Sequence, residues 1–187
     1  MQYIAWYKIL STFKIMKKIL LLSDTHGHID ERILKYAQKA DEIWHAGDIG
    51  GVKVLNDLAS LKPVKSVYGN IDGQEVRLQT TEVNSFNCEG VSVLMLHIAG
   101  YPGRYNLMAR KLINNYKPKL LICGHSHILK VIYDKKNRHL HMNPGAAGIY
   151  GFHKIRTMLR FEINKGKIDN LEAIELGPRS VLSNTIN

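Results

Sequence analysis

The sequence predicts a single α/β domain in which two sheets lie inside outer layers of helices. In the first half of the chain, short apolar runs typical of buried strands alternate with longer runs at helical spacing. The second half consists mainly of paired extended runs typical of hairpins, with one helix inserted among them. At 187 residues the chain is long enough to bury one full core, so we expect one layered domain.

The first half has the order strand, helix, strand, helix, strand. Residues 18–22 form a compact apolar strand, and apolar residues then recur at helical spacing from Ile29 to Ala37. Asp30 and Glu31 fall in the first turn of that helix, where carboxylates are favoured. The same order continues with a strand at 42–46, a helix at 52–59 and a strand at 64–68.

The second half has the pattern of hairpins around one helix and one further apolar strand. Glu89-Gly90, Lys135–Asn137 and Lys165-Gly166 each separate two extended runs, as hairpin turns do. The expected elements are strands at 82–87 and 91–97, a helix at 105–116, a strand at 120–123, and strands at 130–133, 139–142, 157–164 and 168–176.

We expect the domain to span residues 16–176. Residues 1–15 are expected to form a leader outside the core, since Lys8 and Lys14 interrupt the apolar stretch and no small-residue cleavage site follows. The alternative is a helix or an extra strand that docks on the domain. Residues 177–187, which contain Pro178 and several Ser and Asn residues, are expected to be a C-terminal tail.

Composition narrows the partners and the compartment. Lys and Arg number 26 against 16 Asp and Glu, a difference of +10 that favours anionic partners such as phosphate esters or nucleic acid. Cys88 and Cys123 are too few for a disulfide framework, so reduced thiols in the cytoplasm are expected. No run is long and apolar enough to span a bilayer, so we expect a soluble protein with no membrane partner.

Metal-binding side chains follow five of the predicted strands. A parallel sheet would deliver them to one edge, so we expect them to converge on one site. Each short motif alone is weak evidence, because such motifs commonly serve as turns, and the prediction depends on five segments occurring together. The seven candidate ligands are Asp24, His26, Asp48, Asn70, His97, His125 and His127.

These residue types suit two divalent cations. Hydrolysis of a phosphate ester benefits from two cations about 3.5–4 Å apart, and holding them that close requires a bridging anion. We expect Asp48 to be that bridge, since Gly47 and Gly50-Gly51 leave backbone space around it. Asp24 and His26 can bind the first ion, and His127 can complete its shell.

The second ion is expected to bind Asn70, His97 and His125. His125 and His127 alternate along one loop, so that one imidazole can reach each ion. Mixed carboxylate, imidazole and amide ligands suit manganese, iron, zinc or nickel and argue against calcium. The sequence does not choose among these four metals.

The motifs resemble those of the calcineurin-like metallophosphoesterase family. The similarity extends from Met16 to about Leu176 and is greatest to its small uncapped branch of YfcE-like phosphodiesterases. It implies a four-layer αββα sandwich, a dinuclear metal site and hydrolysis of phosphodiesters or monoesters. The resemblance is carried by Ser23–Gly27, His45–Asp48, Tyr68–Asn70, Leu96-His97, Cys123–His127 and Asn143–Ala146.

Two positions depart from the family pattern. Many members have His after the Gly-Asn motif, placed to protonate the leaving oxygen, and the small branch often has Cys there, whereas this chain has Ile71. Ile98 follows His97 where the family usually has Gly. Because Ile71 cannot donate a proton, we expect a preference for acidic, aryl-type leaving groups over alkyl groups.

Other polar residues receive weaker assignments. Arg104, and Tyr101 beside it, are candidate contacts for the substrate phosphate, with a solvated loop as the alternative. His45 and Asp72 are expected to support the ligands rather than bind metal. No role is assigned to His153 or the other histidines of the hairpin region.

The function predicted from these observations is a dinuclear metal-dependent phosphodiesterase that acts on small phosphate esters by attack of metal-bound hydroxide. Asp48, Asn70 and His97 are the expected catalytic residues. The alternative is a catalytically weak scaffold, since a eukaryotic retromer subunit resembles the same branch. Nucleic-acid binding ranks last because the basic residues are scattered, although a nucleotide substrate and an oligomer both remain open.

Overall fold

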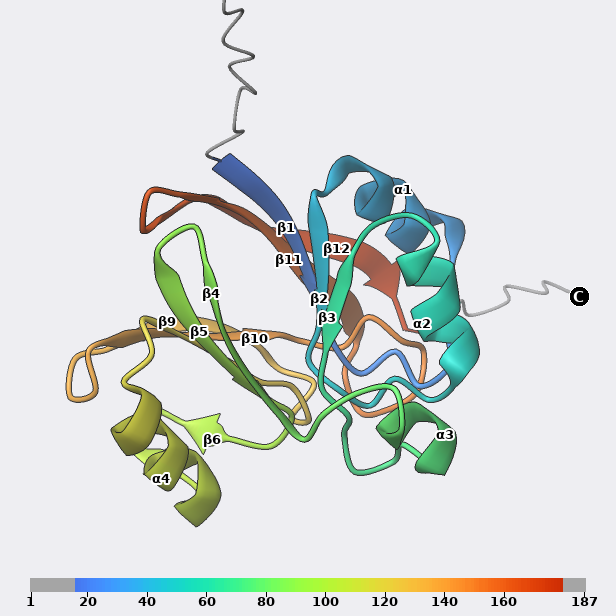
Figure 1. The fold of residues 1–187 in the computed structure, drawn as a ribbon. Coiled ribbons are helices and arrows are strands. Elements are labelled where there is room, and N and C mark those ends of the chain that lie inside the picture. Colours follow the sequence, from blue (N-terminus) through green and yellow to red (C-terminus); the bar gives the residue numbers. More distant parts are fainter. Residues whose placement is uncertain (1–15, 180–187) are drawn as a thin grey trace, which may run out of the picture.

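The computed structural model describes residues 16–179 as a four-layer sandwich. Two five-stranded sheets pack face to face, and helices cover the outer face of each (Figure 1). The predicted αββα architecture is confirmed, and the predicted leader at 1–15 lies outside the described residues. In the described part of the chain, no helix is long and apolar enough to cross a membrane.

The first sheet has the strand order β12-β11-β1-β2-β3. Its first three strands in the sequence are parallel neighbours, and β11 pairs antiparallel with β1. The parallel strands therefore end at the same edge of the sheet. The strands are β1 (Met16–Leu22), β2 (Glu42–His45), β3 (Val64–Ser66), β11 (Ile155–Asn164) and β12 (Lys167–Pro178).

The second sheet has the order β4-β5-β8-β10-β9. Its three central strands are parallel to one another, and the two edge strands pair antiparallel as the outer arms of hairpins. The strands are β4 (Val83–Cys88), β5 (Val91–Leu96), β8 (Leu120–Ile122), β9 (Leu129–Asp134) and β10 (His139–Pro144).

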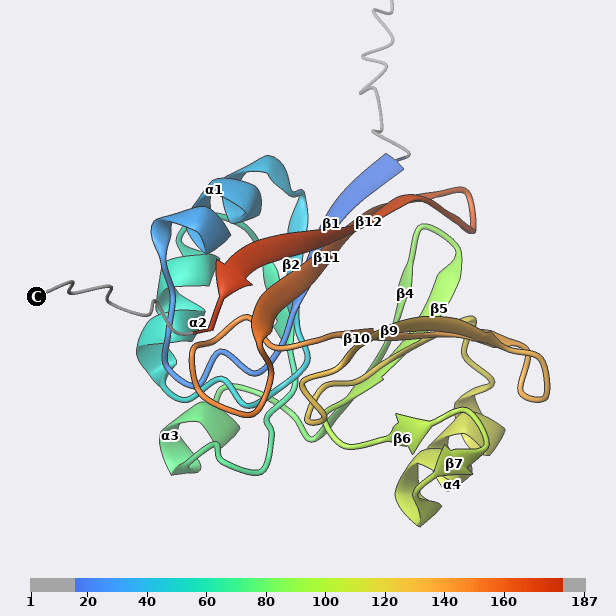
Figure 2. The same cartoon turned by 180° about the vertical axis from the view of Figure 1, so that it is seen from behind.

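The helices lie on opposite outer faces of the sandwich. α1 (Glu31–Lys39) and α2 (Val52–Ala59) cover the first sheet, and α4 (Leu107–Tyr116) covers the second (Figures 1 and 2). Asp30 begins α1 as its N-cap, because its side chain accepts a hydrogen bond from Ile33 N at 3.0 Å. Asn106 begins α4 in the same way, accepting from Ala109 N at 2.7 Å.

Strand β1 shows why the central strands are apolar on both faces. Ile19 and Leu21 point into the core between the two sheets, whereas Leu20 and Leu22 point into the core under α1 and α2. Alternate residues of a strand face opposite sides, so a strand covered on both sides needs an uninterrupted apolar run. This run in the sequence was therefore a reliable signal for a buried strand.

Two small features were not expected from the sequence. A short helix, α3 (Gln74–Arg77), follows the loop after β3, and a two-stranded ribbon pairs β6 (Gly100–Tyr101) with β7 (Arg104–Tyr105). The ribbon takes up the residue at which α4 was expected to begin. Strand β12 also includes Gly177 and Pro178, the first residues of the predicted tail, and the tail from residue 180 lies outside the described residues.

Candidate metal centre

The predicted ligands converge at one end of the sandwich, but they come from two sheets rather than from one. Asp24, Asp48 and Asn70 lie in the loops after β1, β2 and β3 of the first sheet. The histidines at 97, 125 and 127 follow β5 and β8 of the second sheet. The expectation that a single parallel sheet delivers all of them is therefore wrong, because the site forms where the edges of two packed sheets meet.

Most of these residues have an unusual backbone conformation. Positive φ angles are uncommon outside glycine and cost free energy, so they persist only where the surrounding structure imposes them. Here they occur at alternate positions of two loops, at both ligand residues of Asp24–His26 and of His125–His127, and also at Asp48. The residues concerned are Asp24 (54°), His26 (48°), Asp48 (53°), His125 (67°) and His127 (56°).

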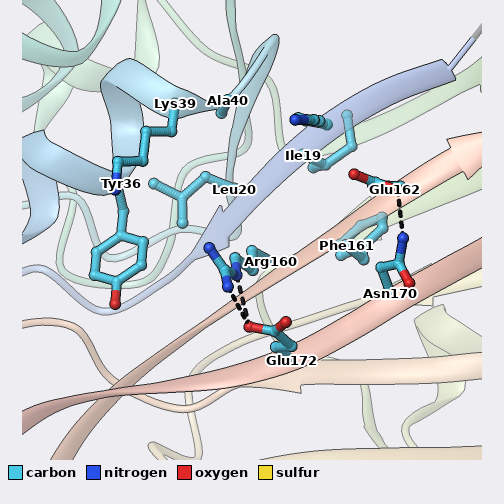
Figure 3. Close-up of a pocket in the computed structure, with 11 residues that line it drawn as sticks. Ile19, Leu20, Tyr36, Lys39, Ala40, Arg160, Phe161, Glu162, Asn170 and Glu172 are labelled. Carbon is cyan, nitrogen blue, oxygen red and sulfur yellow. Dashed lines mark hydrogen bonds and ion pairs between the residues drawn. The ribbon is translucent and has the colours of Figure 1, made fainter.

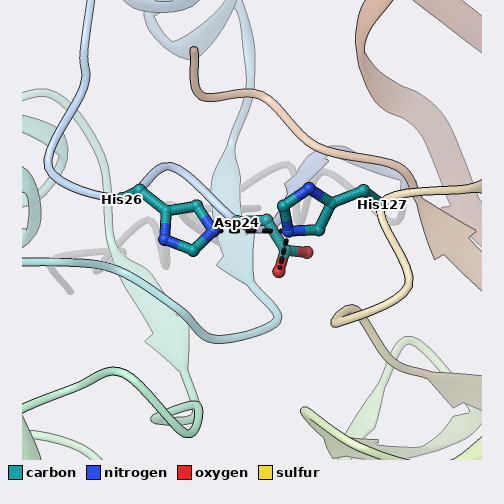
Figure 4. A group of neighbouring side chains, drawn as sticks. All are labelled: Asp24, His26 and His127. Atoms are coloured by element: carbon teal, nitrogen blue, oxygen red, sulfur yellow. Dashed lines mark hydrogen bonds and ion pairs between the residues drawn. The ribbon is translucent and has the colours of Figure 1, made fainter. Parts of the chain in front are cut away.

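Asp24, His26 and His127 form the first group that could hold a cation. One ligand atom from each lies within 4.8 Å of the others. His127 Nε2 is 3.2 Å from Asp24 Oδ1, and His26 Nε2 is 3.3 Å from His127 Nε2. Figure 4 shows the two imidazoles pointing toward each other beside the carboxylate.

Asp48, His97 and His125 form the second group, at the same spacing. His97 Nε2 lies 3.2 Å from Asp48 Oδ1, and the other oxygen of this carboxylate, Oδ2, lies 3.9 Å from His26 Nε2. Asp48 therefore faces both groups, one oxygen to each. This is the position that a bridging carboxylate would need.

Unpaired buried atoms at the centre fit a cation. Asp24 Oδ1 and His97 Nε2 are buried, and neither has a hydrogen-bond partner in the described part of the chain. A buried polar atom without a partner costs about 1–3 kcal/mol, and a metal ion would remove that cost by accepting both lone pairs. The chemistry of the donor set, carboxylate and imidazole, also matches a divalent transition metal.

Asn70 lies at the edge of the centre. Its side chain is exposed, and it lines a groove together with His97. The preceding residue must be glycine, because a Cβ at Gly69 would lie 2.0 Å from Asp48 Oδ1. The following backbone N–H, that of Ile71, donates to the same oxygen at 3.1 Å. The segment Gly69–Ile71 thus holds the Asp48 carboxylate, through close packing at Gly69 and the backbone N–H of Ile71.

The charges of the centre reinforce one another. Burial lowers the pKa of His97, but the nearby Asp48 and Asp24 carboxylates outweigh it, so the pKa of His97 is raised. Burial raises the pKa of Asp48, but His97 and the Ile71 N–H outweigh it, so the pKa of Asp48 is lowered. The geometry therefore favours an ionised Asp48 at neutral pH.

Asp72 connects the loops that carry the ligands. Its buried carboxylate accepts hydrogen bonds from Ile49 N at 3.1 Å and Gly50 N at 2.7 Å, both in the loop after β2. It also accepts one from Gly69 N at 2.8 Å, in the loop after β3. The expectation that Asp72 supports the site rather than binds metal agrees with these contacts.

His45 supports the same loops from inside the first sheet. Thr25 donates its hydroxyl to Ile49 O at 2.9 Å, so it accepts from His45 Nε2 at 2.8 Å. The other ring nitrogen accepts from Gly47 N at 3.2 Å. These bonds require a neutral imidazole, and burial lowers the pKa of His45 to about 4.

His153 contacts the ligand His127, which was not expected from the sequence. Its Nε2 donates to Gly148 O at 3.0 Å, so its Nδ1, at 3.2 Å, accepts from His127 Nδ1. His127 is thereby left with an Nε2 lone pair directed at Asp24 and the first group. No signal in the sequence separates His153 from the other histidines of the hairpin region. It reaches His127 only because the loop between β10 and β11 folds back over the site, and no local pattern predicts the path of that loop.

Two further positions lie away from the ligand groups. Arg104 is exposed on the ribbon strand β7. Tyr101 of β6 contacts Lys130, whose Nζ lies 4.7 Å from the centroid of the tyrosine ring. The predicted contact of Arg104 with substrate phosphate stays a prediction.

A cavity of about 520 Å³ lies beside α1, away from the ligand groups (Figure 3). In its lining, Arg160 Nε donates to Glu172 Oε2 at 2.7 Å, and Asn170 Nδ2 donates to Glu162 Oε2 at 2.6 Å.

Comparison with known proteins places the chain in a family. Residues 16–166 match the calcineurin-like phosphoesterase superfamily domain. The chain belongs to this superfamily. Members usually bind divalent metals, which agrees with the two ligand groups described above.

Two relatives carry the name "Probable metallophosphoesterase". The one from Methanothermobacter thermautotrophicus is 30% identical over 112 residues, which cover 57% of this chain and 64% of the relative, just under two thirds of its length. The one from Mycoplasma pneumoniae is 30% identical over 166 residues, which cover 83% of this chain and 96% of the relative. These similarities support the interpretation that the chain is a metal-dependent phosphoesterase.

Solved structures share the fold at low sequence identity. A structure described as a novel archaeal phosphodiesterase has a TM-score of 0.66 and 20% identity, with 85% of this chain and 99% of that chain covered. Vps29 of Entamoeba histolytica complexed with Zn²⁺ has a TM-score of 0.66 and 16% identity, with 87% and 99% covered. At these identities the likeness establishes the fold alone.

Proposed function

We propose that this protein is a phosphodiesterase with a dinuclear metal centre that hydrolyses small phosphate esters. The observation that supports it best is the pair of adjacent ligand groups facing the two oxygens of Asp48. A mononuclear site would not need a carboxylate in that shared position. The metal ligands we propose are Asp24, His26, Asp48, Asn70, His97, His125 and His127.

The protein's own contribution is to hold the metal ligands in place and to orient their ligand atoms. Two bound cations would neutralise the phosphate oxygens and activate water for attack on phosphorus. Asp48 and His97 are held by the backbone of Ile71 and Ala46, so their ligand atoms need little rearrangement. His125 is exposed, which leaves the second group open to an entering substrate. Manganese, iron, zinc and nickel are the proposed candidates.

The proposal extends to the substrate and the compartment. The excess of basic residues favours an anionic substrate, and we place a small phosphate ester at the centre, with a nucleotide as one possible member of the class. Asn70 and His97 are proposed to contact the ester, and Arg104 to contact a phosphate oxygen. We also propose a cytoplasmic location, because both cysteines are free and buried.

Metal analysis combined with an assay tests this function. Purified protein should contain close to two metal ions per chain, and hydrolysis of bis(4-nitrophenyl) phosphate should stop on chelation and resume on adding metal. Asp48→Asn should lower both the metal content and the rate, the rate by at least about 100-fold. Asp57→Asn makes the same chemical change on α2, where Asp57 pairs with Lys53, and should have no effect.

A scaffold is the second candidate function. The fold is shared with Vps29, and the loop between β10 and β11 exposes Tyr150 (61%) and Phe152 (104%) on either side of Gly151, whose backbone lies against the His127 ring. Exposed aromatic side chains are common at protein interfaces. Two tightly bound metal ions without any turnover of phosphate esters would favour the scaffold over the enzyme.

A further inference from the structure

A groove of about 350 Å³ opens beside His97, between the loop after β3 and the start of α4. We propose that this groove binds a planar aromatic group, an aryl ring or a nucleobase, that is attached to the substrate phosphate. This inference rests on the proposed function, because it places the phosphate at the metal centre. The volume falls in the range of about 300–1000 Å³ that is usual for small-molecule sites.

One wall of the groove is a flat, fixed surface. The Arg77 guanidinium lies over the Tyr68 ring, with Cζ 4.4 Å from the ring centroid. Arg77 Nε also donates to Asp72 O at 2.7 Å, and one terminal nitrogen donates to Gly69 O at 3.4 Å. A guanidinium held in this way presents a planar face on which an aromatic ring can stack.

The opposite wall is apolar and exposed. Ile98 and Met108 line it with 41% and 39% of their surface open to solvent. Asn106 also lines the groove, but its amide is occupied, because Oδ1 accepts from Ala109 N and Nδ2 donates to Ile98 O at 2.8 Å. The wall therefore offers hydrophobic contact, and the methionine can adjust to rings of different shape.

The charges of the groove suit an uncharged ring. Glu82 lines the groove together with Arg77, so the carboxylate offsets the guanidinium charge. With one charge of each sign, the lining gives a second phosphate group little net attraction, whereas a neutral ring needs none. At its inner end the groove is lined by Asn70 and His97, so a ring in the groove can be joined directly to a phosphate at the centre.

Two pairs of ligands that differ only in the ring test this inference. Phenylphosphonate is compared with methylphosphonate, and adenosine 5′-monophosphate with ribose 5-phosphate, by calorimetric titration of manganese-loaded protein. We expect the member with the ring to bind at least about tenfold more tightly in one pair or both, because the ring is removed from water. The pair that shows the preference distinguishes a simple aryl group from a nucleobase.

A matched pair of variants shows whether the ring lies in the groove. Met108→Glu places a charge on the apolar wall and should reduce the preference to less than about threefold. Leu107→Glu makes the same change one residue earlier in α4, at a side chain that is 62% exposed and lies outside the groove, and should keep the preference. Circular dichroism confirms that both variants are folded.

The outcomes separate this inference from the proposed function. Equal affinities within both pairs in the wild type, no binding of any of the four ligands, or a preference that survives in Met108→Glu would each overturn the groove as the ring site. Binding with the expected preference, but without hydrolysis of bis(4-nitrophenyl) phosphate, would instead overturn the enzyme and leave the groove intact. Hydrolysis of bis(4-nitrophenyl) phosphate without any preference for the ring would overturn the groove as the ring site and leave the proposed enzyme intact.

Discussion

At the residue scale, hydrogen bonds fix which ring nitrogen is free in two of the ligand histidines, His97 and His127. His97 donates from Nδ1 to Ala46 O at 2.7 Å, and His127 donates from Nδ1 to His153. In both residues Nε2 is left to face a carboxylate of the ligand groups. Such supporting bonds commonly change metal affinity by about 10–100-fold when they are removed.

Replacing His153 by Phe should therefore weaken the first metal. The ring volume is kept, but the acceptor for His127 Nδ1 is lost, so we expect one of the two metal ions to bind about tenfold more weakly. Competition with a chromophoric chelator measures both affinities. His28→Phe is the control, because His28 is a loop histidine 3.5 Å from Asp30 rather than from a ligand. Unchanged affinities in His153→Phe would contradict the supporting role.

Ile71 leads to a prediction about the leaving group. Its side chain is 46% exposed and cannot donate a proton, although its backbone holds Asp48. Ile71→His should raise the hydrolysis of alkyl phosphodiesters by at least about tenfold and change that of aryl phosphodiesters little, because general acid catalysis matters most for poor leaving groups. Ile71→Gln provides a polar control without an acidic proton. Equal gains in both variants, or none, would count against the idea.

At the element scale, the start of α4 links the second sheet to the groove. Asn106 caps the helix through Ala109 N and holds the loop after β5 through Ile98 O. Together with the ribbon of β6 and β7, this cap sets the point at which the helix begins. One side chain therefore fixes both a helix end and a groove wall.

Removing the cap should destabilise the domain measurably. Asn106→Ala loses the bond to Ala109 N, and loss of an N-cap costs about 1 kcal/mol. We expect the free energy of unfolding in urea to fall by about that amount. Asn114→Ala is the matched control within α4, where its side chain is exposed and alanine is the better helix former, so stability should be equal or slightly higher. A loss in Asn106→Ala that is no larger than in the control would contradict the cap.

At the scale of the whole molecule, the two sheets are held together by an apolar interior that also encloses ionisable groups. Trp44 of the first sheet meets Phe86 of the second edge-on, with ring centroids 5.0 Å apart. On the other side of the second sheet, His141 lies fully buried against the ribbon of β6 and β7, with the Tyr105 hydroxyl at 3.3 Å and Cys123 Sγ at 3.8 Å. Burying an imidazole in such surroundings favours its neutral form.

Because the His141 imidazole is buried, we expect the domain to lose stability in acid. Burial, together with the nearby His139 and Lys130, lowers its pKa from 6.5 to about 4, although Asp134 acts in the opposite direction. Below about pH 6.5 the unfolded chain binds a proton that the folded chain does not, so stability falls between about pH 6.5 and 4, by about 3 kcal/mol at most. Urea unfolding in chelator at several pH values measures this. His141→Phe should have a flatter pH dependence, and an identical dependence would contradict the prediction.

Much of the fold could be predicted from the sequence because its signals are local. Continuous apolar runs such as residues 18–22 mark strands that are covered on both faces, and Asp30 marks a helix start. Short elements escaped prediction. The ribbon of β6 and β7 has only two residues in each strand, and α3 has four, so none of them contains more than about one period of a hydrophobic pattern, which is too short to recognise.

Like the fold, the candidate site has features that could be predicted from the sequence and features that could not. Residue types such as Asp48 between glycines and the two histidines of the Gly124–His127 loop could be recognised along the chain, because the chemistry of a ligand is a property of the residue itself. The contacts that support these ligands could not be recognised in the same way. The bond between His153 and His127, and the bonds from the loop after β2 to Asp72, join residues at least 22 positions apart in the sequence, and no local pattern encodes such a contact.

The sequence by itself therefore determined the layered α/β class, the family and the set of candidate ligands. Only the tertiary structure decided that these ligands come from two sheets, which oxygen of Asp48 faces which ligand group, and that a groove opens beside His97. The physical reason is that a metal centre requires atoms within a few ångströms of one another, and such distances between remote loops arise only when two sheets pack against a shared core.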